Sequence, residues 1–96
     1  MIIADFSMIS RGSGTSAAKY IGAVYDLLKE SNVKFLPGPM STLAETRSFE
    51  ELFDPIEKAN QRLEEMGVQG IITSVHMDYR LDKEISIESK LRAIGK

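Results

Sequence analysis

Residues 48–80 read SFEELFDPIEKANQRLEEMGVQGIITSVHMDYR and hold the two periodicities that decide the fold of this 96-residue chain. The part up to Gly67 repeats apolar residues every three or four positions, which is typical of one face of a helix. The part from Val68 to Arg80 alternates along its length, which is typical of a strand with two unlike faces. A helix that leads directly into a long strand indicates an α+β unit.

The rest of the chain extends this pattern in both directions. The predicted elements, in order, are a strand over 2–9, a helix from Thr15 or Ser16 to about Asn32, short strands over 33–36 and 40–46 on either side of Pro37-Gly38-Pro39, a helix over 48–67, a strand over 68–80, and a short helix capped by Ser86. The order β-α-β-β-α-β predicts a ferredoxin-like sandwich, in which two helices cover one face of a four-stranded antiparallel sheet. We expect a single domain over residues 1–96.

The helix ends carry their own signals. Ser48 with Glu51 three residues later is a capping-box pattern, and Gly67 and Gly95 stand where a helix ends. Pro55 interrupts the pattern of the second helix because proline has no N–H to donate. Two outcomes are open there, namely a kink, or a restart of the helix with Asp54 as its cap.

The face of the sheet away from the two helices is expected to be bare. Alternation places a mixture of isoleucines, small hydroxyl residues and ionisable residues on it: Ile3, Asp5, Ser7, Ile9, Ile72, Ser74, His76, Asp78 and Arg80. The isoleucines make this face more apolar than a solvated surface requires. We therefore expect either a second subunit or a ligand to cover it.

The composition argues against several classes of function. With 12 basic and 14 acidic residues the net charge is −2, so neither nucleic acid nor an anionic membrane is an expected partner. The absence of cysteine removes disulfides and thiolate chemistry, and the sequence shows no leader and no apolar run long enough to span a membrane. We expect a cytoplasmic protein that carries no metal and no cofactor.

Three groups of residues then stand out by their order and spacing over nearly the whole chain. They are Gly14-Thr15-Ser16 with Lys19-Tyr20, Leu36-x-Gly38-Pro39-Met40-Ser41-Thr42 with Glu45, and Asp78-x-Arg80-x-Asp82-Lys83-Glu84. In these groups the chain resembles the thiamine-binding-protein family of small ferredoxin-like proteins. It departs from the family at Ser41 and Thr46, where glycine is usual, and at Ala44, where a larger aliphatic residue is usual. These departures fall on the strand that would line a pocket.

The resemblance implies a homo-oligomer, either a dimer or a tetramer, that binds thiamine or its hydroxymethylpyrimidine half. Such a ligand needs an apolar slot, a carboxylate and a few hydroxyl groups. The residues that the resemblance assigns to ligand binding are Thr15, Ser16, Met40, Ser41, Thr42, Glu45, Asp78 and Arg80. No catalytic residue is implied.

Each assignment has a purely structural alternative. Thr15 and Ser16 are favoured at a turn and helix cap without any ligand, and Glu45 and Arg80 can form surface or intersubunit ion pairs. Asp78 begins a charged run that can be a solvated face. His76 has no second histidine or cysteine near it in the pattern, so a packed or hydrogen-bonded imidazole is a better interpretation than a metal ligand.

Three hypotheses for function follow. The first is a non-enzymatic protein that binds a thiamine-like heterocycle, and the second is a structural or regulatory homo-oligomer without a small ligand. The third is an enzyme, for which a carboxylate pair formed by Asp5 and Asp78 is the one acid–base candidate. Nucleophilic catalysis has no support, because the chain holds one histidine and no elbow motif.

Overall fold

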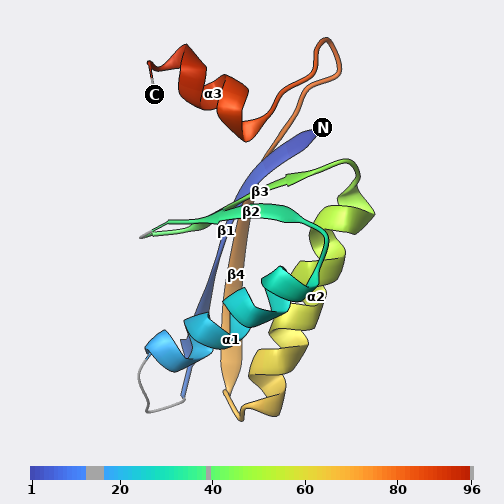
Figure 1. The fold of residues 1–96 in the computed structure, drawn as a ribbon. Coiled ribbons are helices and arrows are strands. Elements are labelled where there is room, and N and C mark those ends of the chain that lie inside the picture. Colours follow the sequence, from blue (N-terminus) through green and yellow to red (C-terminus); the bar gives the residue numbers. More distant parts are fainter. Residues whose placement is uncertain (13–16, 39, 96) are drawn as a thin grey trace.

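The chain forms the predicted α+β ferredoxin-like sandwich in a computed structural model, which describes residues 1–12, 17–38 and 40–95. Figure 1 shows its elements, which are β1 (Ile2–Arg11), α1 (Ala17–Glu30), β2 (Lys34–Pro37), β3 (Thr42–Thr46), α2 (Phe49–Glu65), β4 (Gly70–Tyr79) and α3 (Ile87–Ala93). None of the helices in these ranges is long and apolar enough to cross a bilayer.

The described strands form one antiparallel sheet in the order β2-β3-β1-β4. The register confirms the predicted faces, because Phe6 lies opposite Val75 and Ile9 lies opposite Ile72. Paired residues of antiparallel strands point to the same side of the sheet. The first of these two pairs therefore faces the helices, and the second faces away from them.

The hydrophobic core lies between this sheet and the helices α1 and α2, which share one face of it (Figure 1). The apolar stripes of both helices supply about half of its members. The buried core residues are Ile2, Ala4, Phe6, Tyr20, Val24, Leu28, Val33, Ala44, Leu52, Ile56, Ala59 and Leu63.

Helix α2 begins and ends where the sequence predicts. The Ser48 side chain accepts a hydrogen bond of 3.1 Å from the backbone N–H of Glu51, and Gly67 follows the helix with a φ of 87°. The predicted restart at Asp54 is wrong, because one helix runs through Pro55. That proline is buried on the apolar stripe, and burial of the stripe stabilises the helix despite the hydrogen bond that Pro55 cannot donate.

The second face of the sheet was predicted to be bare, and this prediction is wrong at one end, where α3 covers the sheet. Ile85 and Ile87 pack against Ile3, and all three residues are buried, with exposed fractions of 5–6%. Ser86 caps α3 with a full capping box, in which its side chain accepts from the backbone of Ser89. Burial of two isoleucines that would otherwise lie in water is the physical reason for this docking.

The remainder of this face stays open around Ile9 and Ile72, whose exposed fractions are 60% and 46%. Further along the same face, His76 Nδ1 lies 3.0 Å from Asp5 Oδ1, which confirms the hydrogen-bonded imidazole, whereas the packed alternative is wrong because 83% of the side chain is exposed. The carboxylate pair considered as an acid–base candidate does not form, because Asp5 contacts His76 while Asp78 binds Lys90.

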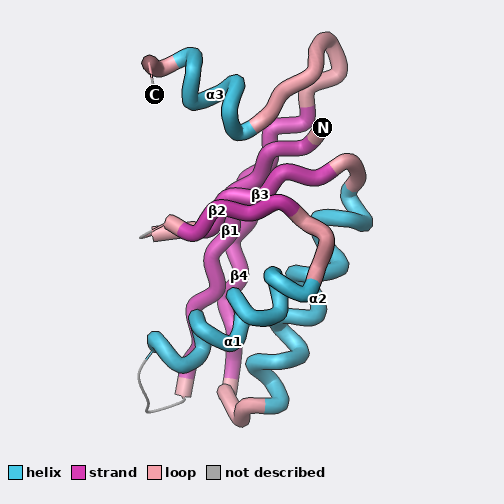
Figure 2. Tube along the Cα trace, in the orientation of Figure 1, coloured by secondary structure: helices cyan, strands magenta, loops and turns pink. Residues whose placement is uncertain are grey.

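The strands differ in length, and this difference creates a notch in the sheet. β3 pairs with residues 2–6 of β1 only, whereas β4 pairs with β1 as far as Arg11. Figure 2 shows the β2–β3 hairpin crossing one half of the longer strands while their other half continues beside α1. Among the described residues, nothing pairs with Ser7–Arg11 on the side where β3 would continue.

Candidate functional site

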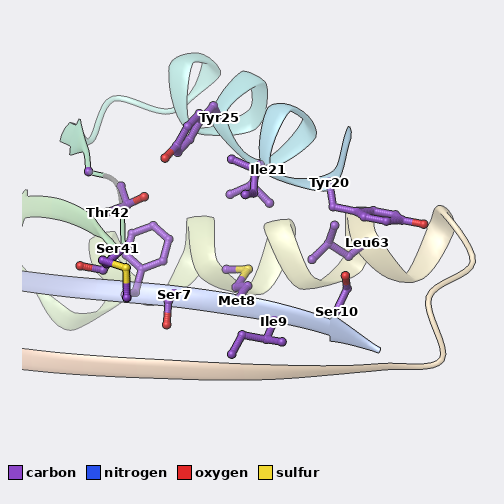
Figure 3. Close-up of a pocket in the computed structure, with 14 residues that line it drawn as sticks. Ser7, Met8, Ile9, Ser10, Tyr20, Ile21, Tyr25, Ser41, Thr42 and Leu63 are labelled. Atoms are coloured by element: carbon purple, nitrogen blue, oxygen red, sulfur yellow. The ribbon is translucent and has the colours of Figure 1, made fainter. Parts of the chain in front are cut away.

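A cavity of about 310 Å³ fills this notch. β1 forms one wall, α1 forms the roof, and the turn between β2 and β3 closes one end, as Figure 3 shows. The described residues that line it are Phe6, Ser7, Met8, Ile9, Ser10, Tyr20, Ile21, Val24, Tyr25, Gly38, Met40, Ser41, Thr42 and Leu63. This volume lies at the lower end of the range typical of small-ligand sites.

The hairpin turn places the closing residues. The backbone N–H of Gly38 donates a hydrogen bond of 3.0 Å to the carbonyl of Ser41, which holds the turn shut. Thr42 lies opposite Phe6 and so points to the helix side, where it is buried. Met40 lies at the tip with 89% of its surface exposed, so an apolar, adaptable side chain stands at the mouth.

The wall contributed by β1 has two kinds of residue. Met8 and Ser10 project toward α1, whereas Ser7 and Ile9 project to the opposite side of the sheet (Figure 3). Ser7 and Ile9 therefore border the cavity mainly through their backbone. This division follows from the two-residue period of a strand.

The described lining is uncharged. It offers aromatic rings, thioethers, aliphatic groups and several hydroxyl groups, but no side chain of lysine, arginine, histidine, aspartate or glutamate. The Tyr25 ring also stacks on Phe35 of β2, with centroids 6.4 Å apart, and this contact stabilises its position. Such a lining suits a flat, largely apolar molecule with a few hydrogen-bonding groups.

The predicted ligand-binding residues divide into two groups in space. Met40, Ser41 and Thr42 line the cavity together. Thr15 and Ser16 lie outside the described residues. Glu45, Asp78 and Arg80 lie at the other end of the sheet, around α3.

Glu45 belongs to the support of α3. Its Oε1 accepts a hydrogen bond of 2.8 Å from the backbone N–H of Ile87, at the positive end of the α3 dipole. Lys90 Nζ donates to Asp78 at 2.6 Å, and Lys34 pairs with Glu88. The carboxylates of this group therefore bind the protein's own backbone and lysines.

Arg80 contacts Asp82, with 2.7 Å between Nε and Oδ1. The hydrogen bonds from this guanidinium lower the pKa of Asp82 from its ordinary value of 3.8 to about 2. Both side chains are exposed, so this is a surface ion pair. The contacts of Arg80 therefore agree with the structural alternative, a surface ion pair.

The contributions of β1 and α1 to the cavity were not predicted. They include Met8, Ser10, Tyr20, Ile21 and Tyr25. The strands expected over 2–9 and 40–46 are nearly equal in length, so the sequence did not indicate the difference between β1 with 10 residues and β3 with 5 residues. A long strand beside a short one leaves an unpaired edge, and side chains next to that edge are accessible.

Comparisons with known proteins bear on the whole chain. Residues 4–95 match the family model described as thiamine-binding protein. The chain is 31% identical to UPF0045 protein MJ1052 of Methanocaldococcus jannaschii, over 98% of this chain and 92% of that one. It is also 31% identical to UPF0045 protein YqgV of Bacillus subtilis, over 100% of this chain and 96% of that one.

Solved structures match as well. The structure of the hypothetical protein MJ1052 superposes with a TM-score of 0.88 over 98% of this chain and 95% of that one. A candidate thiamine biosynthesis or salvage protein from Thermotoga maritima superposes with a TM-score of 0.82 over 97% of each chain, at 19% identity. At that identity the second likeness shows the fold alone.

Proposed function

This chain belongs to the thiamine-binding protein family, and we propose that it is a non-enzymatic protein that binds thiamine or a thiamine-like pyrimidine such as hydroxymethylpyrimidine, working as a homo-oligomer. The observation that carries the proposal is the uncharged cavity in the notch, which contains Met40, Ser41 and Thr42 of the family motif. The match of residues 4–95 to the thiamine-binding protein family model supports the same ligand class.

The chemistry of the lining favours one orientation of thiamine. The aminopyrimidine ring is flat and uncharged, so it suits the interior between α1 and β1. The thiazolium ring carries a positive charge, and no described lining residue offers a carboxylate to it. We place the thiazolium at the mouth, where water and the nearby ring of Tyr25 can stabilise the cation.

The same lining supports binding rather than catalysis. General acid–base chemistry needs a titratable side chain within hydrogen-bond reach of the reacting group. Apart from two tyrosines, the described lining provides none. The pair formed by His76 and Asp5 lies on the other face of the sheet, where 83% of the His76 side chain is exposed.

A thermal-denaturation series tests the proposed ligand. Addition of hydroxymethylpyrimidine or thiamine at millimolar concentration should raise the melting temperature by several degrees, because a ligand at about 100 times its Kd stabilises by about 2.7 kcal/mol. Ser41→Trp, which fills the mouth, should abolish the shift. Asn32→Trp, at an exposed position after α1, should retain it. No shift in the unmodified protein with either compound would overturn the proposal.

The homo-oligomer is supported by the apolar surface that remains on the second face. Ile9 and Ile72 lie side by side there, and their exposed fractions are 60% and 46%. Ile72→Lys should yield a smaller folded species in light scattering and sedimentation, because a charge in such an interface costs several kcal/mol. A protein that is already monomeric before substitution would contradict this part of the proposal.

The same open face favours a second candidate function, a structural or regulatory homo-oligomer without a small ligand. The two candidates separate in the Ile72→Lys variant. A dissociated variant that still responds to pyrimidine supports the binding protein. An oligomer that responds to neither compound supports the second candidate.

A further inference from the structure

Among the described residues, no strand pairs with the edge of β1 that faces the notch. Residues 7–10 include no proline and no charged side chain. Proteins usually block an open edge with such residues or cover it, because its unpaired N–H and C=O groups invite another strand. An unprotected edge that also borders a cavity is available for a ligand.

The backbone groups that face the notch can be identified. Gln69 donates from its backbone N–H to the carbonyl of Arg11 at 2.9 Å, so the Arg11 carbonyl faces β4. Successive residues of a strand direct their backbone groups to alternate sides. The N–H and C=O of Met8 and Ser10 therefore face the notch, whereas those of Ser7 and Ile9 face β4.

The spacing of these groups suits a single ring. Two residues along a strand span about 7 Å, which is comparable to a substituted six-membered ring. A flat molecule that continues the sheet here would lie in its plane, with its edge on β1. One of its faces would lie under α1, against side chains such as Ile21 and Tyr25 (Figure 3).

We propose, on the premise of the proposed function, that the ligand replaces the missing part of β3 and is recognised by the backbone of Met8 and Ser10. The ligand class is an uncharged planar heterocycle with a hydrogen-bond donor and an acceptor on one edge, as in an aminopyrimidine. The amino group donates to a strand carbonyl, and the adjacent ring nitrogen accepts from a strand N–H. The hydroxyl groups of the hairpin turn then contact the end of the ring.

Amide NMR and hydrogen exchange on the isotope-labelled protein test this recognition mode. On saturation with hydroxymethylpyrimidine, both the Met8 and Ser10 amides should shift, and the exchange of the one that donates to the ring nitrogen should slow by about tenfold or more. The amides of Ser7 and Ile9 already face β4 and serve as internal controls on the same strand. Their exchange should change much less.

A ligand analogue provides a second measurement. The same pyrimidine without its amino group leaves one strand carbonyl unpaired and should bind about tenfold more weakly. A compound that raises the melting temperature while the amides of Met8 and Ser10 stay unchanged would overturn backbone recognition and leave the proposed function intact. Absence of binding by any compound would remove both.

Discussion

The two halves of β1 belong to one strand but have opposite surroundings. Residues 2–6 have a neighbouring strand on each side, and helices cover both faces of the sheet at that end, so Ile2 and Ile3 are 1% and 6% exposed. Within the part of the chain that the structure describes, residues 7–11 pair with β4 and with no second strand, and Ile9 is 60% exposed. The first half is therefore where we expect most of the stability, and the second half is where backbone groups remain available for the proposed ligand, because backbone groups already hydrogen-bonded within the protein cannot bind one.

The largest expected effect comes from shortening the same side chain in each half. Ile2→Ala should reduce the free energy of unfolding by about 2–5 kcal/mol, because it leaves a cavity in the core. Ile9→Ala should change it by less than about 0.5 kcal/mol in the isolated chain. Urea denaturation measures both. Equal losses in the two variants would contradict the contrast between the halves.

The next effect concerns α3, which covers the sheet beside residues 2–6 of β1. Ile87→Ala should reduce the free energy of unfolding by about 2 kcal/mol, because it removes most of the contact between α3 and Ile3. Leu91→Ala, on a more exposed part of α3, should cost less than about 0.5 kcal/mol. If Ile87→Ala unfolds at the same urea concentration as the unmodified protein, α3 does not stabilise this end.

A smaller effect separates stability from binding. Glu45→Gln weakens the charge-assisted hydrogen bond to the Ile87 N–H and should cost about 1 kcal/mol of unfolding free energy. Its affinity for hydroxymethylpyrimidine should stay unchanged in calorimetry, because Glu45 lies on the face opposite the cavity. A large loss of affinity in this variant would place Glu45 in the ligand site after all.

The smallest effect is the pH dependence of the stability that the Arg80–Asp82 ion pair contributes. The pKa of Asp82 is lowered to about 2 in the folded chain, below its ordinary 3.8, so the folded state binds fewer protons than the unfolded state between these values. The contribution of the pair with Arg80 is thus complete above pH 3.8 and lost as the pH falls through about 2. The urea midpoints of the unmodified protein and Asp82→Asn should converge over this range.

A salt titration provides the control for that measurement. Because both side chains are exposed, about 1 M salt should remove most of the difference between the two proteins at pH values above the window. A difference that persists at acid pH or in high salt would point to a cause other than this ion pair.

Much of the fold could be predicted because its signals are local. Ser48, Gly67 and Ser86 mark helix ends through hydrogen bonds and backbone angles that involve only a few neighbouring residues. The assignment of strand residues to two faces follows from the two-residue period, and the register confirms it. The restart at Asp54 was wrong because buried neighbours from elsewhere in the chain decide whether a helix tolerates proline.

The candidate site could be predicted only in part. The motif around Met40 indicated one end of the cavity, whereas Tyr20, Tyr25 and the edge of β1 join it from distant positions. The two-residue period already separates Thr42 from Glu45, since three residues along a strand lead to the opposite face. Thr42 and Glu45 are close in sequence, which suggested that they share one site, but the geometry of the strand places them on opposite faces of the sheet.

The sequence by itself determined the order of the elements, their faces and most of their ends, because each depends on residues within one or two turns of chain. The tertiary structure alone decided how far the β2–β3 hairpin extends along β1, and that α3 closes one end of the second face. Both outcomes depend on contacts between surfaces that are distant in the sequence, and local periodicity does not specify such contacts.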